Sequence, residues 1–359
     1  MTLTILIPCL NEEKTIARCV QVAQATAKKL KLTHYEILVA DNGSTDHTIQ
    51  RLQRFKKEKN VRIMHVRTKG YGAALHYGIL SAKYSYIFFA DADLSYDFHQ
   101  LVLFLPAIQQ KNDLILGSRF LGKIEPHSMP FLHQYFGTPL LTFLIRMIYR
   151  IPTTDCNSGM RVVKKSFYKK ILMKNNGMEW ASELLVKTAL LGGKYSEVPI
   201  TFRKDQRGKH SHLKSWRDGW RHLKVIVLLK PFSFVIAALL SIVFAALSIS
   251  FSQVTALSWV LLSEFFSFSF LILKELEEAM TNRPNRISHF LNGIPLVVIG
   301  IIFTTFAIAQ LLVLPGQYSM IKIFVIAQVL FFDIWLFFIE TIKTHLISPL
   351  HNTNIHAAV

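Results

Sequence analysis

Four long apolar stretches in the last third of the sequence constrain the fold more than any other feature. They cover residues 232–251, 256–273, 295–314 and 321–342. A helix needs about 20 mostly apolar residues to cross a bilayer core, and the first and third stretches meet that requirement without a charge. The second contains Glu264 and the fourth contains Asp333 and Glu340, so they fit a span less well. The sequence predicts an all-α membrane domain of about four helices at 231–345 and a tail at 346–359.

The basic residues predict the orientation of these spans. The chain carries 41 Lys and Arg against 23 Asp and Glu, a net charge of +18, and its densest basic segment, residues 203–224, adjoins the first span. Cytoplasmic flanks of membrane helices are enriched in Lys and Arg. A basic run beside a span also argues against nucleic-acid binding, which we exclude from the partners. Residues 1–230, which alternate short apolar runs with charged stretches, are expected to face the cytoplasm from the cell (inner) membrane in a multi-pass protein.

The N-terminal region and the cysteines agree with that compartment. No basic stretch followed by a cleavable apolar segment opens the chain, so no signal peptide is expected. Cys9, Cys19 and Cys156 lack metal-like spacing and suit a reducing environment.

Strand-like and helix-like segments alternate through the first 93 residues, which predicts an α/β domain. Strands are expected at 2–10, 35–43, 61–67 and 86–93, with helices at 11–30, 44–58 and 69–83. We expect Glu12 and Glu13 in the first turn of the first helix, and Ser44 or Thr45 as the cap of the second. Short links between strand and helix imply right-handed crossovers and a mainly parallel sheet.

Acidic residues follow two of these strands. Ligands of parallel sheets bind beyond the carboxyl ends of the strands, where Pro8, Asp41, Asp91 and Asp93 fall. Residues i and i+2 of a strand share a side, so the last two carboxylates can converge. Such a pair repels unless a cation is present, and Mg²⁺ or Mn²⁺ takes one or two carboxylates together with phosphate oxygens. The alternative is a solvated turn after a strand.

Four short motifs together resemble family 2 glycosyltransferases with the GT-A nucleotide-diphospho-sugar-binding fold. They are PCLNEE (8–13), ADNGSTD (40–46), KGYGAAL (69–75) and ADADLS (90–95). The resemblance implies a divalent cation, Mg²⁺ or Mn²⁺, on Asp91 and Asp93, with Asp93 also counted as catalytic. It implies a nucleotide-sugar site made of Pro8, Asn11, Glu12, Asp41, Lys69, Gly70, Asp91 and Ala92.

Later segments are similar to bacterial polyprenyl-phosphate (dolichyl-phosphate-type) sugar synthases. LILGSRF (114–120) implies that Arg119 lies near phosphate as a catalytic residue, and TTDCNSGMR (153–161) implies an assisting Asp155 and a functional Arg161. Glu183 is either the family's acidic helix residue or an ion-pair partner of Arg161; both interpretations stay open.

The acceptor side departs from that pattern. Relatives often carry a Ser-Arg pair where this chain has QYFG (134–137), and some carry Gln where it has Ser95. The acceptor phosphate is therefore assigned to the remaining basic side chains of this region, Arg119, His133, Arg161, Arg203, Arg207 and Lys209. The segment 203–224 is also explained by topology alone, or by binding of anionic lipid head groups.

An apolar region at 124–152, interrupted by Gly137 and Pro139, is too short on either side of these residues to span a bilayer. We expect interfacial helices there; a buried core helix is the alternative.

The implied function is inverting transfer of a hexose, glucose or mannose, from a UDP- or GDP-sugar to polyprenyl phosphate at the membrane. A phosphate monoester, with a second pKa near 6, needs no strong base to act as nucleophile. A family 2 transferase with another lipid or polysaccharide acceptor is the alternative, although the Q-x-x-R-W motif of processive synthases is absent. The nucleobase and a homo-oligomeric state are left open.

Overall fold

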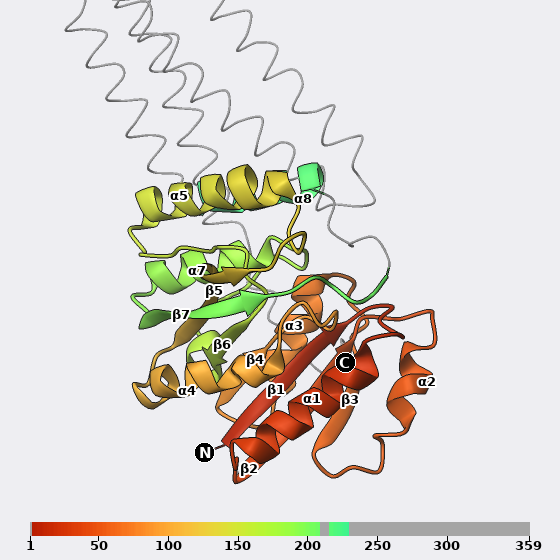
Figure 1. Ribbon diagram of the computed structural model, residues 1–359. Helices are drawn as coiled ribbons and strands as arrows, with labels where there is room; N and C mark the ends of the chain where they lie inside the picture. The colour runs from red at the N-terminus through yellow and green to blue at the C-terminus, as the bar shows by residue number, and fades with distance from the viewer. Residues whose placement is uncertain (1, 209–214, 230–359) are drawn as a thin grey trace, which may run out of the picture. The chain divides into compact units, whose positions relative to one another are not determined.

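The computed structural model describes residues 2–208 and 215–229 (Figure 1). The chain divides into two compact units, with a boundary between residues 229 and 230. All described residues belong to the first unit. The predicted membrane domain, the tail and Lys209 lie outside the described residues. Among the helices of the described part, none has the length and apolar character needed to cross a membrane.

The described part is built on a seven-stranded sheet with the strand order β3-β2-β1-β4-β6-β5-β7. The strands are β1 (Thr2–Cys9), β2 (His34–Asp41), β3 (Val61–His65), β4 (Tyr86–Phe89), β5 (Leu114–Ile124), β6 (Arg161–Lys164) and β7 (Tyr195–Phe202). Strands β1 to β4 pair in parallel, as do β5 and β7, whereas β6 runs antiparallel to both of its neighbours. The predicted α/β fold with a mainly parallel sheet is confirmed.

Helices cover both faces of this sheet. They are α1 (Ile16–Lys29), α2 (Thr48–Gln53), α3 (Tyr71–Ser81), the short η1 (Phe98–Gln100), α4 (Leu101–Gln109), the π-helical η2 (His133–Gly137), α5 (Thr138–Tyr149), α6 (Lys165–Tyr168), α7 (Trp180–Leu190) and α8 (Ser215–Leu228). Alternate residues of β1 enter two separate cores: Ile5 packs with α1 and α4, and Leu6 packs with α3, α5, α7 and α8. The period of two along the strand thus produces a three-layer domain.

The first helix begins later than the sequence pattern indicates. Helix α1 starts at Ile16, so Glu12 and Glu13 precede it and the prediction of first-turn acidic residues is wrong. The physical reason is a turn that closes before the helix, in which the Thr15 amide donates to the Glu12 carbonyl at 3.1 Å. Glu12 is thereby placed at the end of β1, where it is available to a site.

The second helix also begins later, at Thr48 with His47 as its N-cap residue, so the predicted caps Ser44 and Thr45 are wrong. These side chains fasten two loops instead. The Ser44 hydroxyl accepts from the Asn11 amide at 2.9 Å, and Asn11 Oδ1 accepts from the Thr45 amide at 2.8 Å. The loops after β1 and β2 are therefore held against each other.

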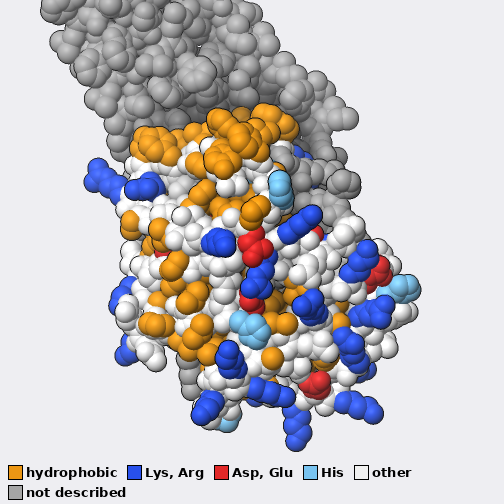
Figure 2. Space-filling model, viewed as in Figure 1, with side chains coloured by type: hydrophobic (Ala, Val, Ile, Leu, Met, Phe, Trp, Pro, Cys, Tyr) orange, Lys and Arg blue, Asp and Glu red, His pale blue; other side chains and the backbone are white. Residues whose placement is uncertain are grey.

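One face of η2 and α5 is apolar and exposed. Helix α5 buries Leu141 and Ile145 in the core, while its other side and the preceding turn leave seven large side chains more than half exposed: Phe131, Leu132, Tyr135, Phe136, Leu140, Phe143 and Met147. We call these seven the apolar ridge; Figure 2 shows it as a hydrophobic band over α5. On α8, which contacts α5, Trp216 is 89% exposed. Exposed apolar surface of this extent is typical of interaction sites.

A buried histidine joins α8 to α7 and predicts acid sensitivity. His222 Nδ1 lies 2.7 Å from the Ser182 hydroxyl, and burial lowers the His222 pKa to about 4, with Asp218 opposing the shift and Arg161 adding to it. The unfolded chain binds this proton with a pKa near 6.5, so stability is kept above that pH and lost as pH falls from about 6.5 to 4. The loss attributable to His222 at pH 5 is about 2 kcal/mol.

We expect His222→Gln, which keeps a hydrogen-bonding group opposite Ser182, to flatten this dependence. The thermal unfolding midpoints of the wild-type and His222→Gln proteins at pH 7.5 and pH 5 measure this pH dependence. An equal fall in both proteins would assign the acid sensitivity to other groups.

Candidate active site

Asp93 lies at the carboxyl edge of the sheet, four residues beyond the end of β4, and is 6% exposed. Its two carboxylate oxygens have different partners. Oδ1 accepts from the Ser95 amide at 2.9 Å and from the Ser95 hydroxyl at 2.6 Å. Oδ2 accepts from the Arg207 guanidinium at 2.9 Å. Ser95 therefore fixes the orientation of the carboxylate, and Oδ2 is the oxygen that faces the site.

Asp91 lies beside Asp93 but is held from another side. Its Oδ1 accepts from the Tyr71 hydroxyl at 2.8 Å. Its Oδ2 packs so closely on Gly159 that a Cβ there would lie 2.4 Å away. Burial and the neighbouring Asp93 charge raise the Asp91 pKa to about 6. Both carboxylates lie at this edge of the sheet, but β4 ends at Phe89, so the predicted strand 86–93 is too long and strand alternation does not place them.

Glu12 is the third carboxylate here. It is 6% exposed, its Oε1 lies 3.2 Å from Arg207 Nη1, and its Oε2 accepts from the Thr15 hydroxyl at 3.2 Å. Burial raises the Glu12 pKa to about 7, although the positive charge of Arg207 acts in the opposite direction. Within the described ranges, no group of three or more His, Cys, Asp or Glu side chains has the spacing to hold a metal ion by itself.

Asp41 ends β2 and is 1% exposed. Its carboxylate accepts from the backbone amides of Gly43 and Ser44 at 3.1 and 3.2 Å. Its Oδ2 lies 3.1 Å from Nδ1 of His65, which ends β3 in register with Asp41. His65 was not predicted from the sequence, although its position after an apolar strand next to the Asp41 strand is the signal that could have identified it.

The remaining residues expected on the nucleotide side lie around the same loops. Lys69 Nζ donates to the Asn42 carbonyl at 3.0 Å, and the Gly70 amide donates to Asn42 Oδ1 at 2.7 Å. Gly70 has φ +132°, and a Cβ there would lie 2.0 Å from the Asn176 carbonyl oxygen, so only glycine fits. Pro8 pairs with Ala40 beside Asp41, and the buried Ala92 lies between the two aspartates.

Arg119 and Asp155 form a buried ion pair. Arg119 Nε and Nη2 each donate to one Asp155 oxygen at 2.7 Å, and the Arg119 amide donates to Oδ2 at 3.1 Å. Asp155 is 0% exposed and Arg119 is 8% exposed. The guanidinium also lies 5.1 Å from the ring centre of Phe202. Both Asp155 oxygens and two of the three guanidinium nitrogens are thus engaged with each other, which favours a structural role for the pair.

The prediction that Arg161 binds the acceptor phosphate is wrong. It is 0% exposed and donates to the backbone carbonyls of Ser158, Ala181 and Cys156 at 2.8–2.9 Å. Glu183 is not its partner. Glu183 Oε1 lies 2.5 Å from Lys187 Nζ and accepts from the Lys174 amide at 2.8 Å.

The other acceptor-side residues are dispersed. Arg203 pairs with Asp97 at 3.1 Å and Glu125 at 3.7 Å, and His133 lies in η2, where burial and the Arg119 charge lower its pKa. Arg207, expected at the acceptor phosphate, instead pairs with Asp93, which is expected to hold a cation, and with Glu12, which is expected at the nucleotide sugar.

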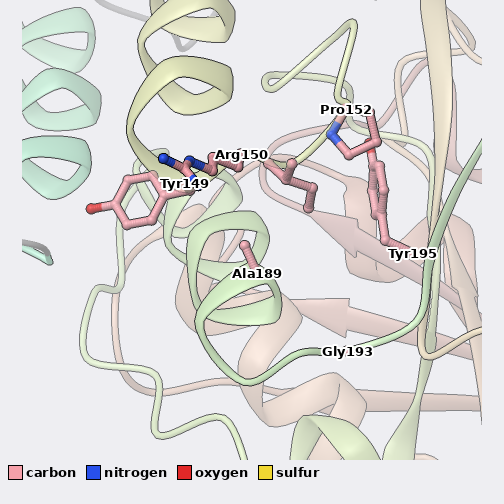
Figure 3. A pocket seen from close by; sticks show the side chains of 7 residues that line it. Tyr149, Arg150, Pro152, Ala189, Gly193 and Tyr195 are labelled. Carbon is pink, nitrogen blue, oxygen red and sulfur yellow. The ribbon is translucent and has the colours of Figure 1, made fainter.

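A separate cavity of 210 Å³ lies at the opposite end of β5 and β7. Its lining residues, shown in Figure 3, are Tyr149, Arg150, Ile151, Pro152, Ala189, Gly193 and Tyr195. Tyr195 pairs with Leu114 at the start of β5, so this cavity is remote from Asp93.

Comparisons with known proteins agree with the motifs. Residues 4–172 match the profile of Glycosyl transferase family 2. The low-salt glycan biosynthesis hexosyltransferase Agl6 of Haloferax volcanii is 34% identical over 231 residues, which cover 64% of this chain and 54% of Agl6. A dolichol-phosphate mannosyltransferase of Pyrococcus furiosus is 26% identical over 58% of each chain. This chain thus spans little more than half the length of either relative.

Among solved structures, glucosyl-3-phosphoglycerate synthase from Mycobacterium tuberculosis aligns with a TM-score of 0.50 at 18% identity, over 63% of this chain and 79% of the synthase. This similarity supports the GT-A-like fold alone. The match over residues 4–172 agrees with the loops gathered at the carboxyl edge, and within these residues the chain is similar to family 2 glycosyltransferase domains.

Proposed function

We propose that this protein transfers a hexose from a UDP- or GDP-sugar to polyprenyl phosphate with inversion at the anomeric carbon. The observation that carries the proposal is the convergence of Glu12, Asp41, Asp93 and the Lys69–Gly70 turn at one edge of the sheet. The dolichol-phosphate mannosyltransferase and hexosyltransferase relatives support the lipid acceptor and the hexose.

The residues at this edge fit a divalent cation bound to a diphosphate. Carboxylate oxygens of Asp93 and Asp91 are the hard ligands that Mg²⁺ and Mn²⁺ prefer, and substrate phosphates commonly complete such shells. A bound cation supplies Lewis-acid stabilisation of the leaving diphosphate. The protein's own contribution is to orient Asp93 through Ser95, to restrain Asp91 through Tyr71, and to hold the nucleoside-side loops through Asp41.

The acceptor phosphate is proposed to approach from the side of η2. His133 lies there. Of the two arginines after β7 that were assigned to the acceptor, Arg203 has a side chain that is 47% exposed and Arg207 one that is 12% exposed. The Arg119–Asp155 pair anchors the start of the loop that leads into β6 behind this region. Because a phosphate monoester is already nucleophilic at neutral pH, positioning by cationic side chains is sufficient and no strong general base is assigned.

The apolar ridge supports a membrane-borne acceptor. Its side chains lie on the helices nearest to His133, and amphipathic helices of this kind lie along the surface of a bilayer (Figure 2). We propose that the ridge contacts the lipid surface and that residues 1–230 face the cytoplasm in a multi-pass membrane protein.

The ridge predicts an effect on long lipid acceptors. Phe136→Ser and Phe143→Ser should each raise the KM for a C55 polyprenyl phosphate roughly five-fold, because each removes about 1 kcal/mol of apolar burial against lipid. The KM for a short, water-soluble prenyl phosphate should stay unchanged. Leu172→Ser, which alters an equally exposed side chain away from the ridge, is the control. Equal effects on both acceptors would place the ridge outside lipid recognition.

The direct test of the function is a donor and acceptor screen with the full chain in vesicles. Labelled UDP-glucose and GDP-mannose are supplied with undecaprenyl phosphate, and formation of an acid-labile, lipid-soluble labelled product is measured. Transfer from one donor to the lipid phosphate is expected. Transfer only to another lipid or to a growing polysaccharide would reject the polyprenyl phosphate acceptor.

A further inference from the structure

The chain segment that follows β7 runs along the loop that carries Asp93. Tyr96 and Phe202 form an antiparallel bridge, the Arg203 amide donates to the Ser95 carbonyl at 2.9 Å, and the Gln206 amide donates to the Asp93 carbonyl at 2.9 Å. Residues 203–207 are thus fastened to residues 93–96 by backbone hydrogen bonds. We call residues 203–207 the strap.

The strap places one guanidinium among three carboxylates. Arg207 Nη1 lies 3.2 Å from Glu12, and Nη2 lies 2.9 Å from Asp93 and 3.4 Å from Asp205. The Arg207 side chain is 12% exposed. A guanidinium keeps its positive charge in proteins, so Arg207 is a cation in contact with these carboxylates.

Arg207 meets the oxygen that a cation would use. Asp93 Oδ1 already accepts two hydrogen bonds from Ser95, so Oδ2 is the oxygen directed at the site, and Oδ2 is the atom bonded to Arg207. A guanidinium and a divalent cation compete for one carboxylate oxygen, because two positive charges held at about 2–3 Å from the same atom repel each other.

The hydrogen bonding of Arg207 is also less complete than that of the buried Arg119 and Arg161. Arg207 Nε is buried without a hydrogen-bond partner in the described structure, and its partner Asp205 is 31% exposed on the side chain. By contrast, Arg119 directs Nε and Nη2 at Asp155, and Arg161 directs three nitrogens at backbone carbonyls. A buried donor without a partner lowers the free energy needed to move the side chain out.

We propose that Arg207 is an internal counter-ion that closes the cation site, and that a divalent cation binds Asp93 only as the strap lifts and Arg207 leaves. The proposal rests on the proposed role of Asp93 as a cation ligand. Gly208, which follows the strap, has φ +66°, a conformation that glycine adopts without strain, and it is a suitable pivot for this movement. The device would offset part of the negative charge of three carboxylates until a divalent cation binds.

Binding of Mn²⁺ alone, measured by electron paramagnetic resonance on the full chain without nucleotide, tests the competition. Arg207→Ala should lower the apparent Kd for Mn²⁺ by roughly ten-fold or more, because the competitor for Asp93 is removed. Lys204→Ala removes the same charge from an exposed position of the strap and should change the Kd less than two-fold. An Arg207→Ala protein with the wild-type affinity would overturn the proposal.

Two further measurements distinguish a failure of the cation role of Asp93 from a failure of the strap movement. Asp93→Asn should abolish Mn²⁺ binding; wild-type affinity in that variant would reject the cation role of Asp93 and with it the proposed function. Hydrogen exchange of the wild-type chain needs no variant to fold. Addition of Mn²⁺ should accelerate exchange of the Arg203 and Gln206 amides, whereas unchanged or slower exchange would show that the strap stays in place and would refute the movement.

Discussion

Asp93→Asn should lower sugar transfer by about 10³-fold or more while the fold is retained. Asparagine keeps an oxygen that can accept both hydrogen bonds from Ser95, so the loop conformation is preserved. What is lost is the negative charge at Oδ2, the oxygen that faces the site. Lewis-acid stabilisation of a leaving group is worth several kcal/mol, and each 1.36 kcal/mol corresponds to a factor of ten in rate.

The rate is measured with saturating donor and Mn²⁺, next to a thermal unfolding midpoint that establishes folding. Asp113→Asn is the matched control, because Asp113 pairs with Lys164 at the opposite end of the sheet and should retain full activity. Residual activity above a tenth of wild type in Asp93→Asn would contradict the assignment of the leaving-group cation to this carboxylate.

Asp155→Ala should reduce the free energy of unfolding by about 3–5 kcal/mol, the range found when one partner of a buried ion pair is removed. Asp155 is 0% exposed and accepts three hydrogen bonds from Arg119, two of them from the guanidinium. Without the Asp155 carboxylate, the buried Arg119 guanidinium has no counter-ion. For a domain of this size the loss corresponds to a fall of roughly 10 °C in Tm.

The double variant Arg119→Met with Asp155→Leu removes both charges and should recover part of the stability, since apolar replacements of a whole buried pair are often tolerated. Differential scanning fluorimetry of the three proteins gives the comparison. A wild-type Tm in Asp155→Ala together with lost transfer would instead make Asp155 a residue that acts on the substrate.

The donor half of the site was predictable because its signals are local. Each parallel strand could be recognised from its own apolar run, and parallel pairing brings the strand ends together, as in the registers of Cys9 with Asp41 and Asp41 with His65. The starts of α1 and α2 were not predictable, because they depend on contacts between the loops at Asn11 and Ser44, which are 33 residues apart.

The roles of the arginines were not predictable either, because they too depend on contacts between residues far apart in the sequence. Arg119, Arg161 and Arg207 all belong to motifs or basic segments, and nothing in their immediate neighbours distinguishes a buried arginine from an exposed one. Their partners are set by the tertiary fold: Asp155 is 36 residues from Arg119, and Asp93 is 114 residues from Arg207. An acceptor role was therefore assigned to Arg161, although its guanidinium is enclosed by backbone carbonyls.

The reversed direction of β6 determines where the segment between β5 and β6 joins the sheet. Because β5 runs toward the edge that holds Asp93 and β6 starts from that same edge, the excursion at 125–160 leaves and re-enters the sheet at one place. The second end of this excursion also packs on the donor side, because Gly159 lies against the Asp91 carboxylate. Under the proposed function, the segment that carries His133 and the apolar ridge is thus joined to the sheet only at the edge where the donor is proposed to bind.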